Sequence, residues 1–453
     1  MLPIVLALLP GLPATAAETE DEARGGVRIE LGLEERVRSE NWDNLRDYSD
    51  DADDGVRQWR FRTRLWSRIE IGSRVGLDLV LNSESRKVTD PDTRFRWDEW
   101  IVEGLALGVR LGPRWSVKAG RQDLMRGEGF ILMDGGPLDG SRTAYFNAID
   151  VTGRLGATTV EVIGISNPRE DEYLPTWNDR DRLLVEWDER AIGTYVTDKT
   201  LPGTTLEGYV FRKTETNDPR PETDPQCQPD RTLGVLGARV DRKLGRGFSV
   251  TAEIAHERGT QDPDVPVRAW GGYAFLRKTF DGDPARTTFA FGWTGLSGDD
   301  PGTETVEGWD PPFSRWPKWS ELYIYSQLSE KGIAYWTNLG MWQAEATFAP
   351  VKPLAMRFTW YRMGAFHPFA GDPSMFGPGK RRGDMMQVRG DVKLPAGFRG
   401  HVLLERLAPG SFYAGSATAW FFRVEAIWTW RGTPRTVRTR RGRRTSGARR
   451  RGP

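Results

Sequence analysis

Three arginines at every second position, Arg60, Arg62 and Arg64, are the side chains of this sequence best spaced to act together. In an extended strand, successive side chains point to opposite faces, so residues two apart share a face. Three like charges on one face cost free energy unless acids or an anionic solute offset them. Because a guanidinium binds a carboxylate through two parallel hydrogen bonds, the triplet predicts either internal ion pairs or a site for carboxylates such as sugar acids.

Other basic residues fall on the polar faces of further predicted strands. We expect these residues to line the same water-facing surface: Arg68, Lys118, Arg357, Arg389, Lys393 and Arg423. Acids on the polar faces predict that part of this set is mutually ion-paired: Glu30, Asp78, Glu253, Asp391 and Glu425. For a single inward arginine taken alone, an ion pair across the surface is the favoured interpretation.

An aromatic, proline-rich stretch at residues 309–319 offers a second kind of chemistry. Its candidate residues are Trp309, Arg315, Trp316 and Trp319. Sugar rings stack on flat aromatic side chains, so we expect a loop that folds into a pore and narrows it. Packing of a large loop against the rim of a barrel is the alternative.

Catalytic chemistry finds little support. The three histidines, His256, His367 and His401, occur without a Gly-x-Ser-x-Gly elbow, a His-x-x-x-His pair or a phosphate-binding glycine loop. The single thiol, Cys227, cannot build a cysteine metal or redox site. We therefore expect a protein that is not an enzyme and that holds no cofactor and no metal.

The elements that must position these residues have a period of two. Apolar and polar residues alternate near 27–38, 57–70 and 417–430, and we count about 18 such strands. Tight turns alternate with long polar loops between them, as in bacterial outer-membrane barrels. Aromatic residues near strand ends fit the interfacial girdles of a barrel: Trp115, Tyr209, Trp293, Trp360, Trp428 and Trp430. The pattern predicts an all-β fold, a single transmembrane antiparallel barrel, over a soluble β-sandwich or β-helix.

Three regions follow from composition. The apolar run Ile4–Leu12, followed by small residues to Ala17, predicts a signal peptide over residues 1–17. The barrel is expected over residues 18–431, in the bacterial outer membrane. Residues 432–453 are expected to form an Arg-rich disordered tail. The basic tail offsets a negative charge in the rest of the chain. The formal charge of the whole chain is +1, but residues 1–430 carry 54 basic against 63 acidic groups.

Two motifs carry a family resemblance: Gly120-Arg121-Gln122-Asp123-Leu124 at a strand end, and the stretch 135–142, Gly-Gly-Pro-Leu-Asp-Gly-Ser-Arg, before the next strand. With the Arg-rich second strand and the Trp309 loop, the sequence from Arg28 to Trp430 resembles the alginate-export family of outer-membrane porins. The resemblance implies an 18-stranded monomeric barrel whose arginine-rich constriction passes anionic polysaccharide. Arg121 and Arg142 match its motif positions.

The function expected from these patterns is a passive outer-membrane channel for anionic sugars or an alginate-like polysaccharide. A substrate-specific uptake porin for small carboxylates is one alternative, and a plugged structural or adhesive surface barrel is another. The partners expected are the solute, outer-membrane lipid and the barrel assembly machinery, which would recognise the terminal aromatic Trp430. Nucleic acid is not expected as a partner, and we expect a monomer.

Overall fold

The structure, a computed structural model, describes residues 26–51, 54–133, 146–175, 187–218, 229–314, 320–324, 330 and 336–437. Eighteen long strands and one short strand make up a single sheet. In chain order they are β1 (Val27–Asp43), β2 (Val56–Ile71), β3 (Val75–Asp90), β4 (Arg94–Arg110), β5 (Trp115–Gln122), β6 (Phe146–Leu155), β7 (Thr158–Asn167), β8 (Asp188–Asp198), β9 (Thr204–Thr216), β10 (Arg231–Gly245), β11 (Phe248–Gln261), β12 (Val265–Thr279), β13 (Thr288–Leu296), β14 (Leu339–Val351), β15 (Leu354–Gly364), β16 (Arg381–Lys393), β17 (Phe398–Pro409), β18 (Ala419–Arg431) and β19 (Arg435–Val437). One short helix, α2 (Glu321–Ile324), lies between β13 and β14.

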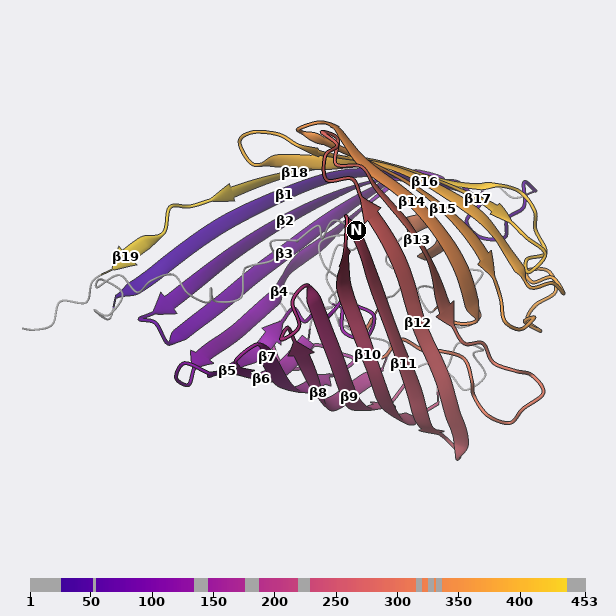
Figure 1. Ribbon diagram of the computed structural model, residues 1–453. Coiled ribbons are helices and arrows are strands. Elements are labelled where there is room, and N and C mark those ends of the chain that lie inside the picture. The colour runs from indigo at the N-terminus through magenta and orange to yellow at the C-terminus, as the bar shows by residue number, and fades with distance from the viewer. Residues whose placement is uncertain are drawn as a thin grey trace, which may run out of the picture.

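The sheet closes on itself. Each of the eighteen long strands pairs antiparallel with its neighbour in the chain, and β18 pairs with β1 from Gly32 opposite Arg431 to Asp43 opposite Trp420. Figure 1 shows the strands following one another round the wall in chain order. The predicted all-β, 18-strand antiparallel barrel is therefore confirmed. Closure leaves no long unpaired edge, as a strand-built membrane protein requires.

The sheet continues beyond residue 431, where the sequence placed the end of the barrel. Residues Arg435–Val437 form β19, which pairs with Val27–Ile29 at the start of β1. The first residues of β1 extend past the end of β18, so these backbone groups need another partner. The beginning of the segment expected to be a tail supplies it.

The two rims of the barrel differ. Long connections, among them 123–145, 168–187, 217–230 and 297–338, leave one rim, and tight turns such as 72–74, 156–157 and 246–247 join the strands at the other. Bacterial barrels have short periplasmic turns and long extracellular loops, which orients the molecule. β1 is longer than the predicted strand near 27–38, because the inward alternation goes on to Asp43 and places Glu40 in the lumen.

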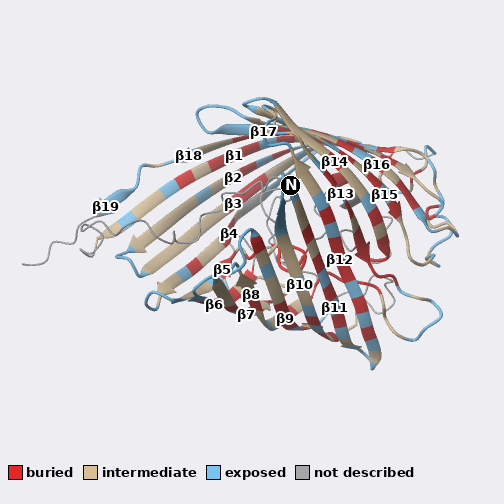
Figure 2. Ribbon diagram, in the orientation of Figure 1, coloured by how far each residue is buried: buried red, intermediate tan, exposed pale blue. Residues whose placement is uncertain are grey.

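Side chains alternate between an apolar outer surface and a packed interior. Large apolar residues such as Leu65, Ile192, Leu236 and Ile254 are exposed on the outside. Red buried and pale blue exposed positions alternate along the strands in Figure 2. This is the arrangement of a barrel whose outer surface faces lipid.

The expected aromatic girdle holds only in part. Trp115 and Trp430 are exposed on the outer surface. Tyr209 is buried inside the barrel and donates a 2.9 Å hydrogen bond to Glu253, so its assignment to the girdle is wrong. Its position in the alternation of β9 points it inward. Among the described residues, no helix is long and apolar enough to cross a membrane.

Candidate functional site

The arginine triplet of β2 lies on the inner wall, and each of its members has an acid partner. Arg62 donates from Nη2 to Glu34 Oε1 at 2.8 Å, and Arg64 donates from Nε to Glu103 Oε2 at 2.8 Å. Arg60 and Arg62 are almost completely buried. Acids of the protein therefore offset the three like charges, and the ion pairs cross from β2 to β1 and to β4.

Glu40 of β1 lies at the centre of the densest part of this wall. Its carboxylate accepts from Arg423 at 2.7 Å, from Arg38 at 3.2 Å and from Arg60 at 3.4 Å. Gln58 donates a further hydrogen bond at 2.9 Å. A carboxylate that accepts from several guanidinium groups shows that this wall can hold an anion in a buried setting.

Further pairs extend this wall into one network. Glu84 accepts from Arg60 at 3.0 Å and from Arg36 at 3.2 Å, and Arg86 lies 3.8 Å away. We call the whole set the lumen arginine cluster. Its arginines are Arg36, Arg38, Arg60, Arg62, Arg64, Arg86, Arg399 and Arg423. Its acids are Glu34, Glu40, Glu84, Glu103, Glu321 and Glu425. The ion pairs thus join more arginines than glutamates.

Two cations toward the periplasmic end share one acid. Arg68 donates to Asp78 at 2.8 Å, and Lys118 Nζ lies 3.5 Å from the same carboxylate. The Lys118 side chain is 41% exposed, so its charge faces water in the lumen. Arg68 and Lys118 therefore share the Asp78 carboxylate at a place where an anion in the lumen can reach Lys118.

The predicted residues of β15 and β16 lie opposite each other on the same wall. Arg357 pairs in register with Arg389. Arg389 donates to Asp391 at 2.8 Å, and Arg357 lies 3.8 Å from Glu345. Both side chains remain partly exposed, so they extend the charged lining toward the periplasm.

Arg121, predicted to line the pore, is instead buried at the end of β5. Its guanidinium donates to both carboxylate oxygens of Asp171, at 2.8 and 2.6 Å, and to the Val102 carbonyl at 2.8 Å. Asp171 belongs to the connection between β7 and β8, so Arg121 fastens that connection to the wall. Arg142 lies outside the described residues.

Asp123 follows directly after β5 and lies beside the lumen arginine cluster. Burial raises the pKa of Asp123 to about 6, and the neighbouring carboxylate of Glu103 adds to the shift. Near neutral pH this carboxyl therefore carries less than a full negative charge. Arg64 and Lys118 lie near enough to oppose the shift of this pKa, so Asp123 faces the charged lining.

The aromatic loop enters the barrel. Trp309 is fully buried and stacks on Phe130, with ring centroids 5.2 Å apart and an interplanar angle of 15°. Phe130 comes from the connection after β5 and also meets Tyr273 of β12, with centroids 5.6 Å apart. Trp309 thus packs in the lumen and is not free to stack on a passing sugar. Arg315, Trp316 and Trp319 lie outside the described residues.

The connection between β13 and β14 reaches two opposite walls. On one side, Arg231 of β10 pairs with Asp310 at 2.7 Å. On the other, Arg423 of β18 donates to Glu321 of α2 at 2.6 Å, and Glu405 of β17 accepts from the backbone of Leu322 at 2.7 Å. Because β10 and β18 stand far apart round the closed barrel, this loop crosses the lumen and narrows it.

A second polar cluster faces the first from the wall of β6 to β12. Arg126 donates to Glu161 at 2.9 Å and to Asp150 at 2.8 Å. Tyr209 and Tyr273 both donate to Glu253, at 2.9 and 2.7 Å. The sequence predicted that Glu253 faces the lumen, but it did not predict that Tyr209 and Tyr273 contact it there.

The sequence interpretation also missed Arg36 and Arg38, which are fully buried in the lumen arginine cluster. A signal was present, because both continue the polar alternation of Arg28, Glu30 and Glu34 along the first strand. Both residues lie within the predicted strand near 27–38, so the alternation alone was enough to place them on its polar face.

A closed 18-strand barrel with an apolar outer surface and a charged, loop-narrowed interior has the architecture of a barrel of the bacterial outer membrane. Solved structures of Pseudomonas aeruginosa proteins are similar in fold. OccK5 (OpdH) matches with a TM-score of 0.54 and 11% identity, covering 89% of this chain and 98% of that chain. OccK11 (OpdR) gives 0.57 and 12%, over 90% and 98%. The outer membrane protein opdK gives 0.57 and 12%, over 89% and 99%.

These likenesses show the fold alone, because the identities are low. Sequence comparison finds no matching family model and no matching curated protein. The coarser expectation, an outer-membrane β-barrel with the fold of these proteins, is confirmed. The structural similarities do not support the alginate-export family in particular.

Proposed function

We propose that the protein is a substrate-specific uptake channel for small carboxylates, which pass along the lumen arginine cluster. The observation that carries the proposal is the combination of this cluster with a loop that spans the lumen beside it. Glu321 of the loop forms an ion pair with Arg423 of the wall. The lumen beside this loop is therefore lined by groups that recognise carboxylates.

The spacing of the cations suits stepwise movement. Arg60, Arg62, Arg64 and Arg68 follow one another down the inner face of β2, and side chains two residues apart are about 7 Å apart. A carboxylate leaving one guanidinium therefore meets the next within a short distance. Binding at several sites of moderate strength lets an ion both enter and leave a pore.

The glutamates that pair with the lumen arginines determine how tightly each arginine binds a passing carboxylate. Each buried arginine already has a glutamate partner, so an entering carboxylate exchanges with a group of the same chemistry. Lys118 shares Asp78 with Arg68, and its partly exposed ammonium is accessible to an entering anion. Exchange of this kind favours passage over tight retention.

The lumen-crossing loop favours a small solute over a polysaccharide. Trp309 and Phe130 pack against each other in the interior, where a polymer would need a continuous open path. A polymer of sugar acids would also have to displace Glu321 from Arg423. A plugged structural barrel is the competing function, and it predicts no current.

Planar-bilayer reversal potentials in a salt gradient test the proposal. The wild-type channel should be anion-selective, and the double variant Arg68→Gln/Lys118→Gln should lose roughly threefold or more of its anion-to-cation permeability ratio. The matched control is Arg406→Gln, since Arg406 lies over the exposed ring of Trp420 on β18. A silent or cation-selective wild type would contradict the proposal, as would a double variant that behaves like the control.

A further inference from the structure

A row of arginines lies on the outside of the barrel, away from the channel. Arg212 of β9 stands opposite Gly234 of β10, Gly234 stands opposite Arg258 of β11, and Arg258 stands opposite Arg268 of β12. All three arginines are exposed. One row of paired positions across four neighbouring strands thus carries three arginines, and Gly234 occupies the fourth position.

The row lies at the upper edge of the lipid-facing surface. It is close to the extracellular ends of its strands, where β9 leads into the long connection at 217–230. The next outward side chains toward the middle of the membrane are Val210, Leu236, His256 and Trp270, all exposed, and three of these four are apolar. The arginines therefore stand where the apolar band gives way to lipid headgroups.

The positive charges of this arginine row are not offset by acids of the described residues. Arg258 and Arg268 are directly opposite on adjacent strands, where like charges are destabilising. Within the described part of the chain, no acid forms an ion pair with Arg212, Arg258 or Arg268. Their position next to lipid adds a further cost for a positive charge. An external anion bound at this height removes both costs.

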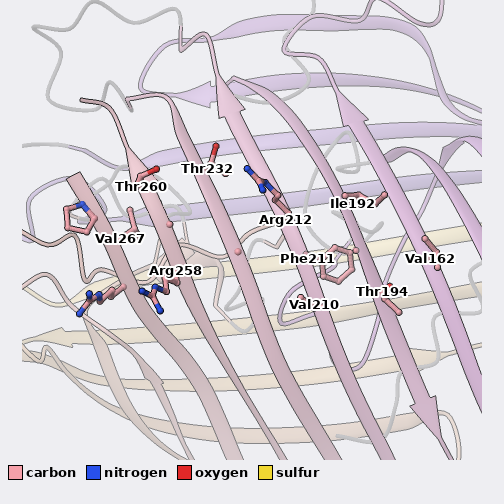
Figure 3. Close-up of a pocket in the computed structure, with 15 residues that line it drawn as sticks. Val162, Ile192, Thr194, Val210, Phe211, Arg212, Thr232, Arg258, Thr260 and Val267 are labelled. Carbon is pink, nitrogen blue, oxygen red and sulfur yellow. The ribbon is translucent and has the colours of Figure 1, made fainter. Parts of the chain in front are cut away.

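The same place is hollowed. A cavity of about 830 Å³ is lined by the three arginines and by Val162, Ile192 and Val210; Ile192 stands opposite Arg212 on β8, and Val210 lies two residues before Arg212 on β9. Figure 3 labels Val162, Ile192, Val210, Arg212 and Arg258 among the side chains that line the hollow, on neighbouring strands. Gly234 lines it without a side chain. The hollow thus joins cationic side chains to apolar ones, the two chemistries of a lipid with an anionic headgroup.

We propose that this outer hollow binds a phosphorylated lipid of the outer leaflet. The phosphate lies among Arg212, Arg258 and Arg268, which can each donate two parallel hydrogen bonds to it. An acyl chain lies against Val162, Ile192 and Val210. The site is separate from the lumen, so the proposal does not depend on which solute the channel transports.

The first test uses wild-type protein, stripped of lipid in detergent, and native mass spectrometry. Diphosphorylated lipid A should bind at least tenfold more tightly than its dephosphorylated form. Equal binding of the two forms would overturn the proposal. So would equally strong competition by inorganic phosphate, which would indicate a site for a bare anion without a lipid.

Variants then separate the two halves of the hollow. Arg212→Gln/Arg258→Gln/Arg268→Gln should lose the tenfold preference for the phosphorylated form, and Arg406→Gln should keep it. Gly234→Leu should weaken lipid binding while leaving the arginines in place. A β-carbon at Gly234 meets only the Arg258 carbonyl, at 3.5 Å, so this substitution fits the sheet. Lipid A binding unchanged in the triple variant would contradict the site.

Discussion

The backbone conformation of Gly120 determines the position of the Arg121 guanidinium. Its φ of 120° lies in a region that residues with a side chain rarely adopt. A β-carbon there would come within 2.2 Å of the Leu105 carbonyl oxygen. This irregular backbone at the end of β5 lets both Arg121 and Gln122 be buried, although they are neighbours in the chain.

Replacing Gly120 by alanine should therefore destabilise the folded barrel. The backbone strain alone is worth about 1–3 kcal/mol, and the clash adds to it. Gly72→Ala is the matched control, because Gly72 also has a positive φ but nothing lies within 4 Å of its β-carbon position. Urea unfolding in detergent should show the larger loss for Gly120→Ala. Equal losses would contradict the role given to the Leu105 contact.

The face of a residue could be predicted from sequence, but its partner could not. Alternation alone placed Arg60, Arg62 and Arg64 inside. Their partners Glu84, Glu34 and Glu103 stand on three different strands, so they depend on the register between strands and on long inward side chains. Tyr209 was misplaced because its nearness to a strand end was considered without its place in the alternation.

At the scale of elements, the connection between β13 and β14 is the feature that turns a wide barrel into a narrow one. Its ends are 296 and 339, and between them it touches β10 through Asp310 and β18 through Glu321. The strands of the wall form their ladder of hydrogen bonds without it. The loop therefore shapes the lumen, and the barrel does not need it to close.

Replacing residues 299–336 by a short Gly-Ser linker should raise the single-channel conductance roughly twofold or more, since conductance follows the width of the pore. Selectivity for small anions should weaken at the same time, because solutes in a wider pore pass farther from the lining arginines. A folded, heat-modifiable band on a gel establishes that the barrel still closes. Unchanged conductance in this folded variant would show that the loop does not restrict the path.

Strands and loops differ in how well the sequence predicts them. All eighteen long strands occur in the predicted order, because the contrast between lipid and water repeats every two residues. The course of the β13–β14 loop depends on contacts with strands far away in the chain, such as Leu322 with Glu405. No local pattern contains that information, and only the aromatic composition around Trp309 suggested entry into the lumen.

At the scale of the whole molecule, charge is sorted by position. The formal charge of +1 says little, because paired arginines and glutamates fill the lumen while much of the surplus lies in the last residues. Arg435–Val437 belong to the sheet, so the basic end of the chain begins within the barrel. The low hydropathy of the chain follows from a wall with only one apolar face.

The family resemblance predicted the barrel and its basic lumen, and the function that we propose differs from it in the solute. The motif at Gly120 and Arg121 serves to anchor a loop through Asp171. The loop at Trp309 closes part of the lumen that a polymer would need. For these reasons we propose a small carboxylate, and not an alginate-like chain, as the solute.

The most direct test of carboxylate transport is solute flux into liposomes that contain the purified protein. Glucuronate and glucose are similar in size and differ chiefly in the carboxylate, and an alginate oligosaccharide adds length. Flux should be roughly threefold or more faster for glucuronate than for glucose, and the oligosaccharide should be excluded. Equal flux of glucuronate and glucose, or entry of the oligosaccharide, would contradict a channel selective for small carboxylates.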